Sequence, residues 1–316
     1  MKHNLPIKIE LPEHFLDEEV RSGYTVTTKQ KKIWAVELDL LAEFKRVCDK
    51  YDLKWFVGYG SLLGIVRHKG FIPWDNDIDI AITRQSFNRL CDVASEEFHD
   101  PYFLQTPMTE EGRYFRTFCK FCNSMTTGAS ELEWLQGINC GLYLDLFILD
   151  EIPDDDRLVQ KMFDRISYYN HFARFYSPYP RHDNMVGKIK NLIWTVIWKC
   201  KYQSCGGDVL FMELSDYLSQ YAGENSHRWM ALEVTPEKSL HLDKTMWNET
   251  LMADFEFMKV PIPNDYDWVL KDHYGDYMEL PPVEQRINHE YLKLEPEVPY
   301  KEYFNSIVSF SSLSIS

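Results

Sequence analysis

The sequence lacks any long hydrophobic run. Its longest apolar stretch, residues 192–198, is seven residues long, whereas a helix that crosses a membrane needs about 20. The first residues contain no apolar stretch of the kind that marks a secretory signal peptide. We therefore expect a cytoplasmic protein, either free or peripheral on the inner face of the membrane.

An excess of basic residues is also missing. The chain of 316 residues has 34 Lys and Arg against 49 Asp and Glu, which gives a formal net charge of −15. A general nucleic-acid-binding protein needs a basic face against the phosphates, so no nucleic-acid partner is expected. This charge is still compatible with a local basic pocket for one phosphorylated ligand.

The cysteines do not form the even set that a secreted disulfide framework requires. The chain has 7 of them, which favours a reducing compartment. Cys119 and Cys122 lie three positions apart in a predicted strand, so their thiols point to opposite faces and a zinc site is disfavoured. Aromatic residues, in contrast, are abundant at 15%, and most of them are expected to be buried in the core.

The spacing of apolar residues predicts alternating strands and helices in the first half of the chain. Strands are predicted over residues 54–58, 75–82, 102–105, 113–123, 141–149 and, as a pair, 246–260; helices are predicted over residues 28–51, 61–67, 83–99 and 263–275, and helical stretches predominate over 154–221. This order predicts an α+β protein, with a mixed-sheet catalytic core in residues 1–150 flanked by helices. A largely helical part, residues 151–316, is expected to pack on that core and complete the substrate site.

Three acidic residues at alternate positions are the most informative feature. In a strand, Asp75, Asp77 and Asp79 point to one face. Three neighbouring carboxylates repel one another unless a cation lies between them, and oxygen ligands suit Mg²⁺ or Mn²⁺. A solvated strand edge is the alternative, but it does not explain why Ile78 and Ile80 oppose the acids. The pattern therefore favours a divalent metal ion and, with it, a phosphorylated substrate.

A second acidic position lies in the apolar segment of residues 141–149. Asp145 is the one charged residue in that run, and such a carboxylate is rarely buried without a partner. The partner is either a basic side chain or the same metal site, since two acidic strands that converge on phosphates form the two-metal pattern. Asp150 has the opposite parity and is interpreted as structural.

Several residues near these acids are suited to bind phosphate. A predicted strand over residues 113–123 places two cations on one face, and the helix that opens after Gly60 directs backbone N–H groups at an anion. A run of three basic residues before the acidic triplet holds phosphate or balances the carboxylates. These substrate-binding candidates are Gly60, Ser61, Arg67, His68, Lys69, Arg116 and Lys120.

The segment over residues 60–79 resembles the signature of the LicD family of phosphocholine transferases, to which the fukutin-related proteins are distantly related. It reads Gly-Ser-Leu-Leu-Gly at 60–64, Arg-His-Lys-Gly-Phe-Ile-Pro-Trp at 67–74 and Asp-Asn-Asp-Ile-Asp at 75–79. Asn76 stands where the family often has Asp, and Ser61 where Thr is common. The similarity extends over roughly residues 30 to 290 through Arg116, Lys120, residues 144–150, residues 262–282 and His289.

This resemblance implies a nucleotidyltransferase fold, whose metal motif is a Gly-Ser turn, an Asp-x-Asp strand and a distant third carboxylate. By the resemblance, Asp77, Asp79 and Asp145 are the catalytic and metal-binding residues. It also implies Mg²⁺-dependent transfer of phosphocholine from CDP-choline to a sugar hydroxyl of a cell-surface glycan, such as teichoic acid or lipopolysaccharide, with release of CMP. Arg116 and Lys120 are then expected to stabilise the leaving CMP.

The sequence leaves alternatives for the function, for the residues that bind choline and for the segment over residues 188–201. Transfer of ribitol- or glycerol-phosphate from its CDP donor, or a non-catalytic glycan- or nucleotide-binding module, are the alternative functions. A choline cation needs an aromatic cage, for which Trp74, Tyr143 and the tyrosines of residues 168–179 are candidates. The lysine-flanked segment over residues 188–201 fits an interfacial helix on an anionic membrane and a buried helix equally well.

Overall fold

The computed structural model describes residues 4–114, 116–175, 206–222, 226–231, 241–247, 250–287 and 293–303. The lysine-flanked segment over residues 188–201, His289 and the end of the tyrosine-rich stretch lie outside the described residues. No helix in the described part of the chain is both long enough and apolar enough to cross a membrane.

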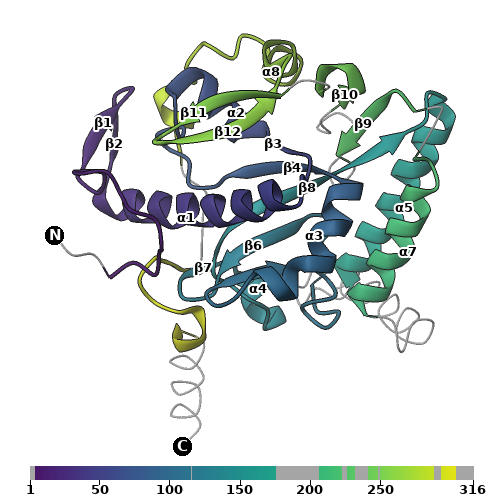
Figure 1. Cartoon of the computed structure of the whole chain (residues 1–316), viewed down its shortest axis with the longest axis horizontal. Helices are drawn as coiled ribbons and strands as arrows, with labels where there is room; N and C mark the ends of the chain where they lie inside the picture. The colour runs from purple at the N-terminus through teal and green to yellow at the C-terminus, as the bar shows by residue number, and fades with distance from the viewer. Residues whose placement is uncertain are drawn as a thin grey trace, which may run out of the picture.

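A mixed β-sheet forms the centre of the molecule (Figure 1). Its seven described strands are β3 (Trp55–Val57), β4 (Asp79–Thr83), β5 (Tyr102–Gln105), β6 (Cys119–Asn123), β8 (Leu142–Ile152), β9 (Arg228–Ala231) and β10 (His241–Asp243). β8 pairs in parallel with β4 along one edge, and antiparallel with β6 and then β9 along the other. β3, β5 and β10 extend the sheet from β4, β6 and β9 respectively.

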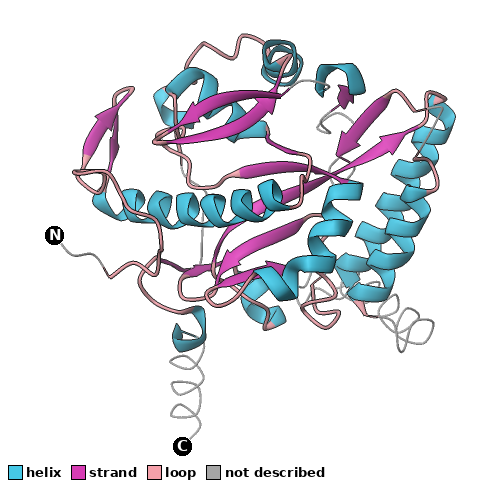
Figure 2. Ribbon diagram, viewed as in Figure 1, coloured by secondary structure: helices cyan, strands magenta, loops and turns pink. Residues whose placement is uncertain are grey.

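Helices flank this sheet (Figure 2). They are α1 (Thr28–Lys50), α2 (Tyr59–His68), α3 (Arg84–Glu97), α4 (Glu131–Gln136), α5 (Asp156–Phe175), α7 (Gly207–Ser219) and α8 (Tyr266–Tyr274), with short 3-10 helices η1 (Lys244–Trp247) and η2 (Val283–Gln285). α1 lies against β8 and β6, α3 lies against β4 and β8, and α7 packs on α5 and β8. The predicted helices over residues 28–51 and 83–99 are confirmed, and each begins after a threonine N-cap, Thr27 and Thr83.

Three two-stranded sheets surround the central one. They pair β1 (Glu19–Arg21) with β2 (Tyr24–Val26), β11 (Thr250–Phe255) with β12 (Met258–Pro263), and β7 (Thr127–Ala129) with β13 (Lys293–Glu295). β12 contacts β3, and α8 and β11 contact α2. Residues from the last fifth of the chain therefore lie against the turn-and-helix segment that begins at residue 58.

The main hydrophobic core lies between α1 and the sheet. The apolar stripe of α1, which includes Ile33, Val36, Leu40 and Phe44, is buried as its helical spacing predicts. The described cysteines are free thiols: Cys48, Cys91, Cys119, Cys122 and Cys140.

The α+β class with a mixed sheet flanked by helices is confirmed, but the expected largely helical C-terminal half is not. Among the described residues after 152, strands β9 and β10 extend the central sheet, β11 and β12 form a hairpin, and β13 pairs with β7. The long strand β8 runs across residue 150, so its last residues need a partner, and β9 supplies it. Trp229, Met230 and Ala231 of β9 are buried there, which a helical interpretation of this region missed.

Two predicted elements are shorter than expected or begin elsewhere. The strand predicted from Asp75 begins at Asp79, and the strand predicted over residues 113–123 begins at Cys119. Among the described residues, those in front of these two strands form no ladder with a neighbouring strand. Ser61, the first residue of the helix predicted over residues 61–67, lies inside α2, whose N-cap is Gly58.

Candidate active site

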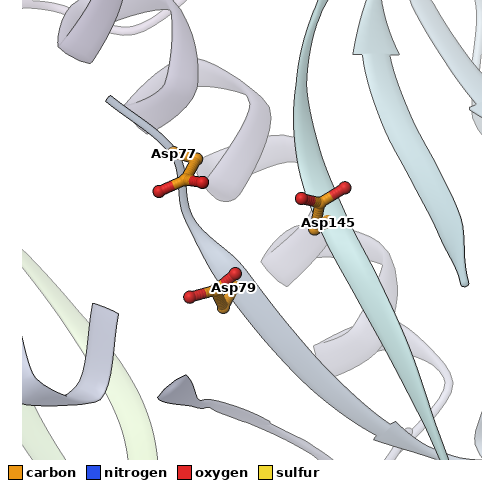
Figure 3. Close-up of side chains that lie close together, drawn as sticks. All are labelled: Asp77, Asp79 and Asp145. Carbon is orange, nitrogen blue, oxygen red and sulfur yellow. The ribbon is translucent and has the colours of Figure 1, made fainter. Parts of the chain in front are cut away.

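Asp77, Asp79 and Asp145 meet at the junction of β4 and β8 (Figure 3). Asp79 is the first residue of β4 and lies directly opposite Asp145 in the parallel register with β8. Asp77 lies in the extended segment just before β4. One carboxylate oxygen of each residue lies within 4.8 Å of the others, a separation that one bound metal ion can span. The three predicted metal ligands are thus brought together.

The loop in front of β4 is fixed by side chains of α1. Gln30 Nε2 donates to the carbonyl oxygens of Pro73 and Asp75 at 2.9 and 3.1 Å. The indole N–H of Trp34 also donates to the Asp75 carbonyl, at 2.9 Å. These bonds hold Asp75 and Asp77 at the end of β4 although neither residue is in a strand.

The turn between β3 and α2 supports the acids from the other side. The backbone N–H of Gly60 donates to Asp79 Oδ2 at 3.1 Å, and the N–H of Asp79 donates to Ser61 Oγ at 2.9 Å. A Cβ atom at Gly60 would lie 3.5 Å from Asp75 Oδ2 and 3.6 Å from Asp79 Oδ2. Tyr59, at the start of α2, has a left-handed φ of 44°, a strained conformation of the kind that clusters at functional sites. Gly60 and Ser61 therefore position the carboxylates, and their predicted phosphate contacts stay predictions.

Burial makes these carboxylates difficult to ionise without a cation. Burial, followed by repulsion from its acidic neighbours, raises the pKa of Asp79 well above its usual value. The pKa of Asp145 rises to about 7, chiefly because of burial. Asp145 Oδ1 is buried and has no hydrogen-bond partner among the described residues. A buried, unsatisfied oxygen beside two further carboxylates fits the oxygen-ligand set of a hard divalent cation, so the triad can bind a metal ion.

Glu37 of α1 is a further acid that the sequence reasoning missed. Its side chain is fully buried, and Oε2 has no hydrogen-bond partner in the described part of the chain. Burial, and after it repulsion from Asp77, Asp75, Asp145 and Asp79, raises its pKa well above the usual value. The signal was present in the sequence, because Glu37 interrupts the apolar stripe of a helix just as Asp145 interrupts an apolar strand.

Lys120 and Arg116 lie beside Asp145 but are held by a carboxylate that was not predicted. Lys120 is opposite Asp145 in the antiparallel register of β6 and β8. Its Nζ lies 2.5 Å from Glu133 Oε1 and 3.4 Å from the centre of the Tyr143 ring. Arg116 Nη2 lies 3.4 Å from the same Glu133 oxygen. These cations lower the pKa of Glu133 to about 2, although burial acts to raise it.

The basic run at the end of α2 is placed away from the triad. Arg67 Nη1 donates to the carbonyl oxygens of Tyr277 and Glu279, and Lys69 is exposed. Burial and the nearby arginines lower the pKa of His68 to about 4, so His68 is neutral at pH 7. Trp74, a candidate for the choline cage, is buried beneath the guanidinium of Arg286, 5.1 Å from its ring centre.

Asp150, interpreted as structural, forms a buried ion pair with Arg84. The guanidinium donates Nε to Oδ1 at 2.8 Å and Nη2 to Oδ2 at 2.7 Å. Both residues line a cavity of about 630 Å³ at the far ends of β4 and β8. Four residues of β4 separate Asp79 from that end, about 13 Å at 3.3 Å per residue, so this cavity is not part of the acidic site.

The arrangement of the three carboxylates is consistent with a nucleotidyltransferase-type metal site: Asp79 begins β4, Asp145 lies opposite it on β8, and Asp77 precedes β4. Among the residues that the structure describes, this is the one group of three or more acidic, histidine or cysteine side chains able to hold a metal ion. A zinc site built on the cysteines is therefore not found in that part of the chain.

Comparison with known proteins shows what the chain is similar to. Residues 52–134 match the LicD/FKTN/FKRP nucleotidyltransferase domain. The chain is 28% identical over 269 residues to the lipopolysaccharide cholinephosphotransferase LicD of Haemophilus influenzae, covering 80% of this chain and 92% of that protein. An uncharacterized protein of Rickettsia prowazekii is 36% identical over 70 residues, which are 22% of this chain and 24% of that protein. The predicted resemblance is confirmed, and residues 52–134 form a LicD-type nucleotidyltransferase domain.

Proposed function

We propose that the protein transfers phosphocholine from CDP-choline to a sugar hydroxyl of a cell-surface glycan, with release of CMP. The observation that carries the proposal is the acidic triad at the junction of β4 and β8, whose members lie within 4.8 Å of one another. The similarity to a lipopolysaccharide cholinephosphotransferase supports phosphocholine as the group transferred. The proposed acceptor is lipopolysaccharide, teichoic acid or a related glycan.

Asp77, Asp79 and Asp145 are proposed to hold Mg²⁺, with Mn²⁺ as the alternative. The bound ion supplies positive charge against the donor pyrophosphate and the charge that develops during transfer. The acceptor hydroxyl oxygen forms a bond to the phosphorus of the phosphocholine group, and the bond from that phosphorus to the CMP oxygen breaks. Asp145 Oδ1, which has no hydrogen-bond partner among the described residues, is proposed to receive the hydroxyl proton.

The two cations beside Asp145 are proposed to have different roles. Lys120 is buried between Glu133 and the Tyr143 ring, so we assign it to the electrostatics of Asp145 rather than to direct substrate contact. The side chain of Arg116 is 33% exposed, and it is proposed to contact the leaving CMP. The Arg286 guanidinium lies over the Trp74 ring, and the Lys120 ammonium lies over the Tyr143 ring. A choline cage built from either ring is therefore less favourable.

A donor screen tests this function. The protein is incubated with Mg²⁺ and CDP-choline, CDP-ribitol or CDP-glycerol, and CMP release and thermal stabilisation are measured with a glycan acceptor. CMP release from CDP-choline and its loss in excess EDTA are the expected results. Preference for CDP-ribitol or CDP-glycerol supports transfer of ribitol- or glycerol-phosphate instead. Binding without CMP release from any donor supports a non-catalytic module.

Peripheral membrane contact remains part of the proposal through the lysine-flanked segment over residues 188–201. Its sequence combines flanking lysines with an apolar centre, as an interfacial helix on anionic lipid requires. Flotation with liposomes of phosphatidylcholine alone and with added phosphatidylglycerol tests it. Binding that needs the anionic lipid supports the contact, and no flotation with either composition refutes it.

A further inference from the structure

Arg67 and Arg286 lack a carboxylate partner within the described residues. Most of the described arginines form an ion pair with Asp or Glu. In a chain with 49 acidic residues and a net charge of −15, an arginine pair without such a partner is unusual. Both side chains are partly buried, where an uncompensated charge is more costly than at an open surface.

Hydrogen bonds to neutral acceptors fix the position of each guanidinium. Arg67 donates Nη1 to the carbonyl oxygens of Tyr277 and Glu279 at 2.9 and 3.1 Å, and its Nε to His68 Nε2 at 3.0 Å. Arg286 donates Nε to the Pro281 carbonyl and Nη1 to the Ser22 carbonyl, both at 2.9 Å. The Nη2 group of each arginine has no hydrogen-bond partner in the part of the chain that the structure describes, so its two N–H donors are available.

Trp74 and His68 connect the two arginines. The Arg286 guanidinium lies over the Trp74 ring, and the His68 ring packs edge-on against Trp74 with centres 6.0 Å apart. Burial is the main cause of the lowered pKa of Arg67, and repulsion by Arg286 lowers this pKa further. The two like charges are therefore close enough to destabilise each other, and an anion between them would relieve that repulsion.

Arg67 lies on the helix whose other end supports the acidic triad. α2 carries Gly60, whose N–H bonds Asp79, at one end and Arg67 at the other, about 10 Å away at 1.5 Å per residue. The charges of both groups act on Tyr274 of α8. After burial, Asp79 contributes most to raising the pKa of the Tyr274 phenol, whereas Arg67 acts in the opposite direction.

We propose that Arg67 and Arg286, which His68 and Trp74 connect, form an anion subsite that binds a phosphate group of one of the substrates. Guanidinium groups suit this role, since their fork of N–H donors matches phosphate oxygens. The inference deepens the proposed function and rests on it, because phosphate-bearing substrates are expected there. It also moves phosphate binding away from Lys120, whose charge Glu133 already neutralises in part.

Inorganic pyrophosphate is the probe, and its binding is measured by titration calorimetry in excess EDTA, which removes any contribution from a bound metal. Arg67→Gln and Arg286→Gln are each expected to weaken pyrophosphate binding by about tenfold or more, the usual effect of losing a charge-assisted pair of hydrogen bonds. Arg89→Gln is the matched control. Arg89 is exposed on α3, lies over the Tyr51 ring and also forms no ion pair among the described residues, so this change should leave pyrophosphate affinity within about twofold.

Urea denaturation of each variant checks that the fold is intact, because Arg67 also holds the chain at residues 277–279. Arg286→Lys keeps the charge but loses the fork, and it is expected to recover part of the affinity lost in Arg286→Gln. Pyrophosphate affinity equal to that of the unmodified protein in folded Arg67→Gln and Arg286→Gln overturns the proposal. An equal loss of pyrophosphate affinity in Arg89→Gln also overturns the proposal, because the effect would then come from the net charge of the protein.

Activity measurements separate this subsite from the proposed function. A raised KM for CDP-choline in the two variants assigns the phosphate to the donor. An unchanged donor KM together with weaker pyrophosphate binding assigns it to a phosphorylated acceptor. If the unmodified protein releases no CMP from any CDP-alcohol while both variants lose pyrophosphate binding, the proposed function fails and the subsite stands. If it releases CMP and neither variant changes pyrophosphate affinity or KM, the subsite fails and the function stands.

Discussion

Replacing Glu133 with Gln tests the electrostatics beside the metal site. The Glu133 carboxylate lies 2.5 Å from Lys120 Nζ, and the two side chains are only 3% and 4% exposed. Gln has the same shape and still offers an oxygen to the Ser130 hydroxyl, which donates to Glu133 Oε2 at 2.7 Å. The substitution therefore removes the charge alone and leaves a buried ammonium without its counter-charge.

The expected loss follows from the pKa of Glu133. Lowering it from 4.5 to about 2 corresponds to about 3 kcal/mol, at about 1.4 kcal/mol per pH unit. This agrees with the ~3–5 kcal/mol typical of breaking one side of a buried ion pair. Because the folded-state pKa is below the unfolded value, the contribution is fully present above pH 4.5 and is lost as the pH falls toward 2.

Urea denaturation at a series of pH values measures the effect. Glu133→Gln should unfold at lower urea at pH 7, and its difference from the unmodified protein should shrink between about pH 5 and 2. Asp254→Asn is the matched control, since Asp254 and its partner Lys259 are each 64% exposed and such a pair contributes at most about 1 kcal/mol. A loss in Glu133→Gln no larger than in this control would refute the assignment.

Three further predictions concern the site and its support. Asp77→Ala and Asp79→Ala should each abolish CMP release while the urea midpoint stays near or above that of the unmodified protein; full activity in either variant contradicts the metal assignment. Glu37→Gln should stabilise the metal-free protein at pH 7 in EDTA, because the raised folded-state pKa of Glu37 makes its ionisation a cost that grows as the pH rises above 4.5; an unchanged or lower urea midpoint counts against this. Gly64→Ala should destabilise by ~1–3 kcal/mol, since its Cβ would lie 2.5 Å from the Gly70 carbonyl oxygen; a more stable variant in the same assay would show that this contact relaxes freely.

Much of the fold was predictable because local spacing sets it. The stripe of apolar residues over 28–51, the threonine caps and the short apolar runs predicted α1, α3, β3 and β5 close to their observed bounds. The sequence was less informative for β9 and β10, which are short strands. β9 pairs with β8, and β10 pairs with β9. This pairing stabilises both strands, and the local sequence does not indicate which strand each of them pairs with.

The sequence by itself determined the acidic triad. Alternate spacing singled out Asp75, Asp77 and Asp79, and a lone charge in an apolar strand singled out Asp145. The resemblance to the LicD family then selected Asp77, Asp79 and Asp145, and the parallel register of β4 and β8 places Asp79 opposite Asp145. Both predictions hold because Asp79 begins β4 and Asp145 lies within β8. These strands belong to the central sheet, so the core sets the spacing of their apolar residues.

Only the tertiary structure decided which charges face the triad and which are already paired. Lys120 proved to be held by Glu133 rather than free for phosphate, and Arg286 lies beside Trp74, more than 200 residues away in sequence. Periodicity along one segment shows which face a side chain points to, but it carries no information about the segment that packs against that face. Ion pairing depends on that second segment, because the charge–charge energy is set by distance in space and by burial.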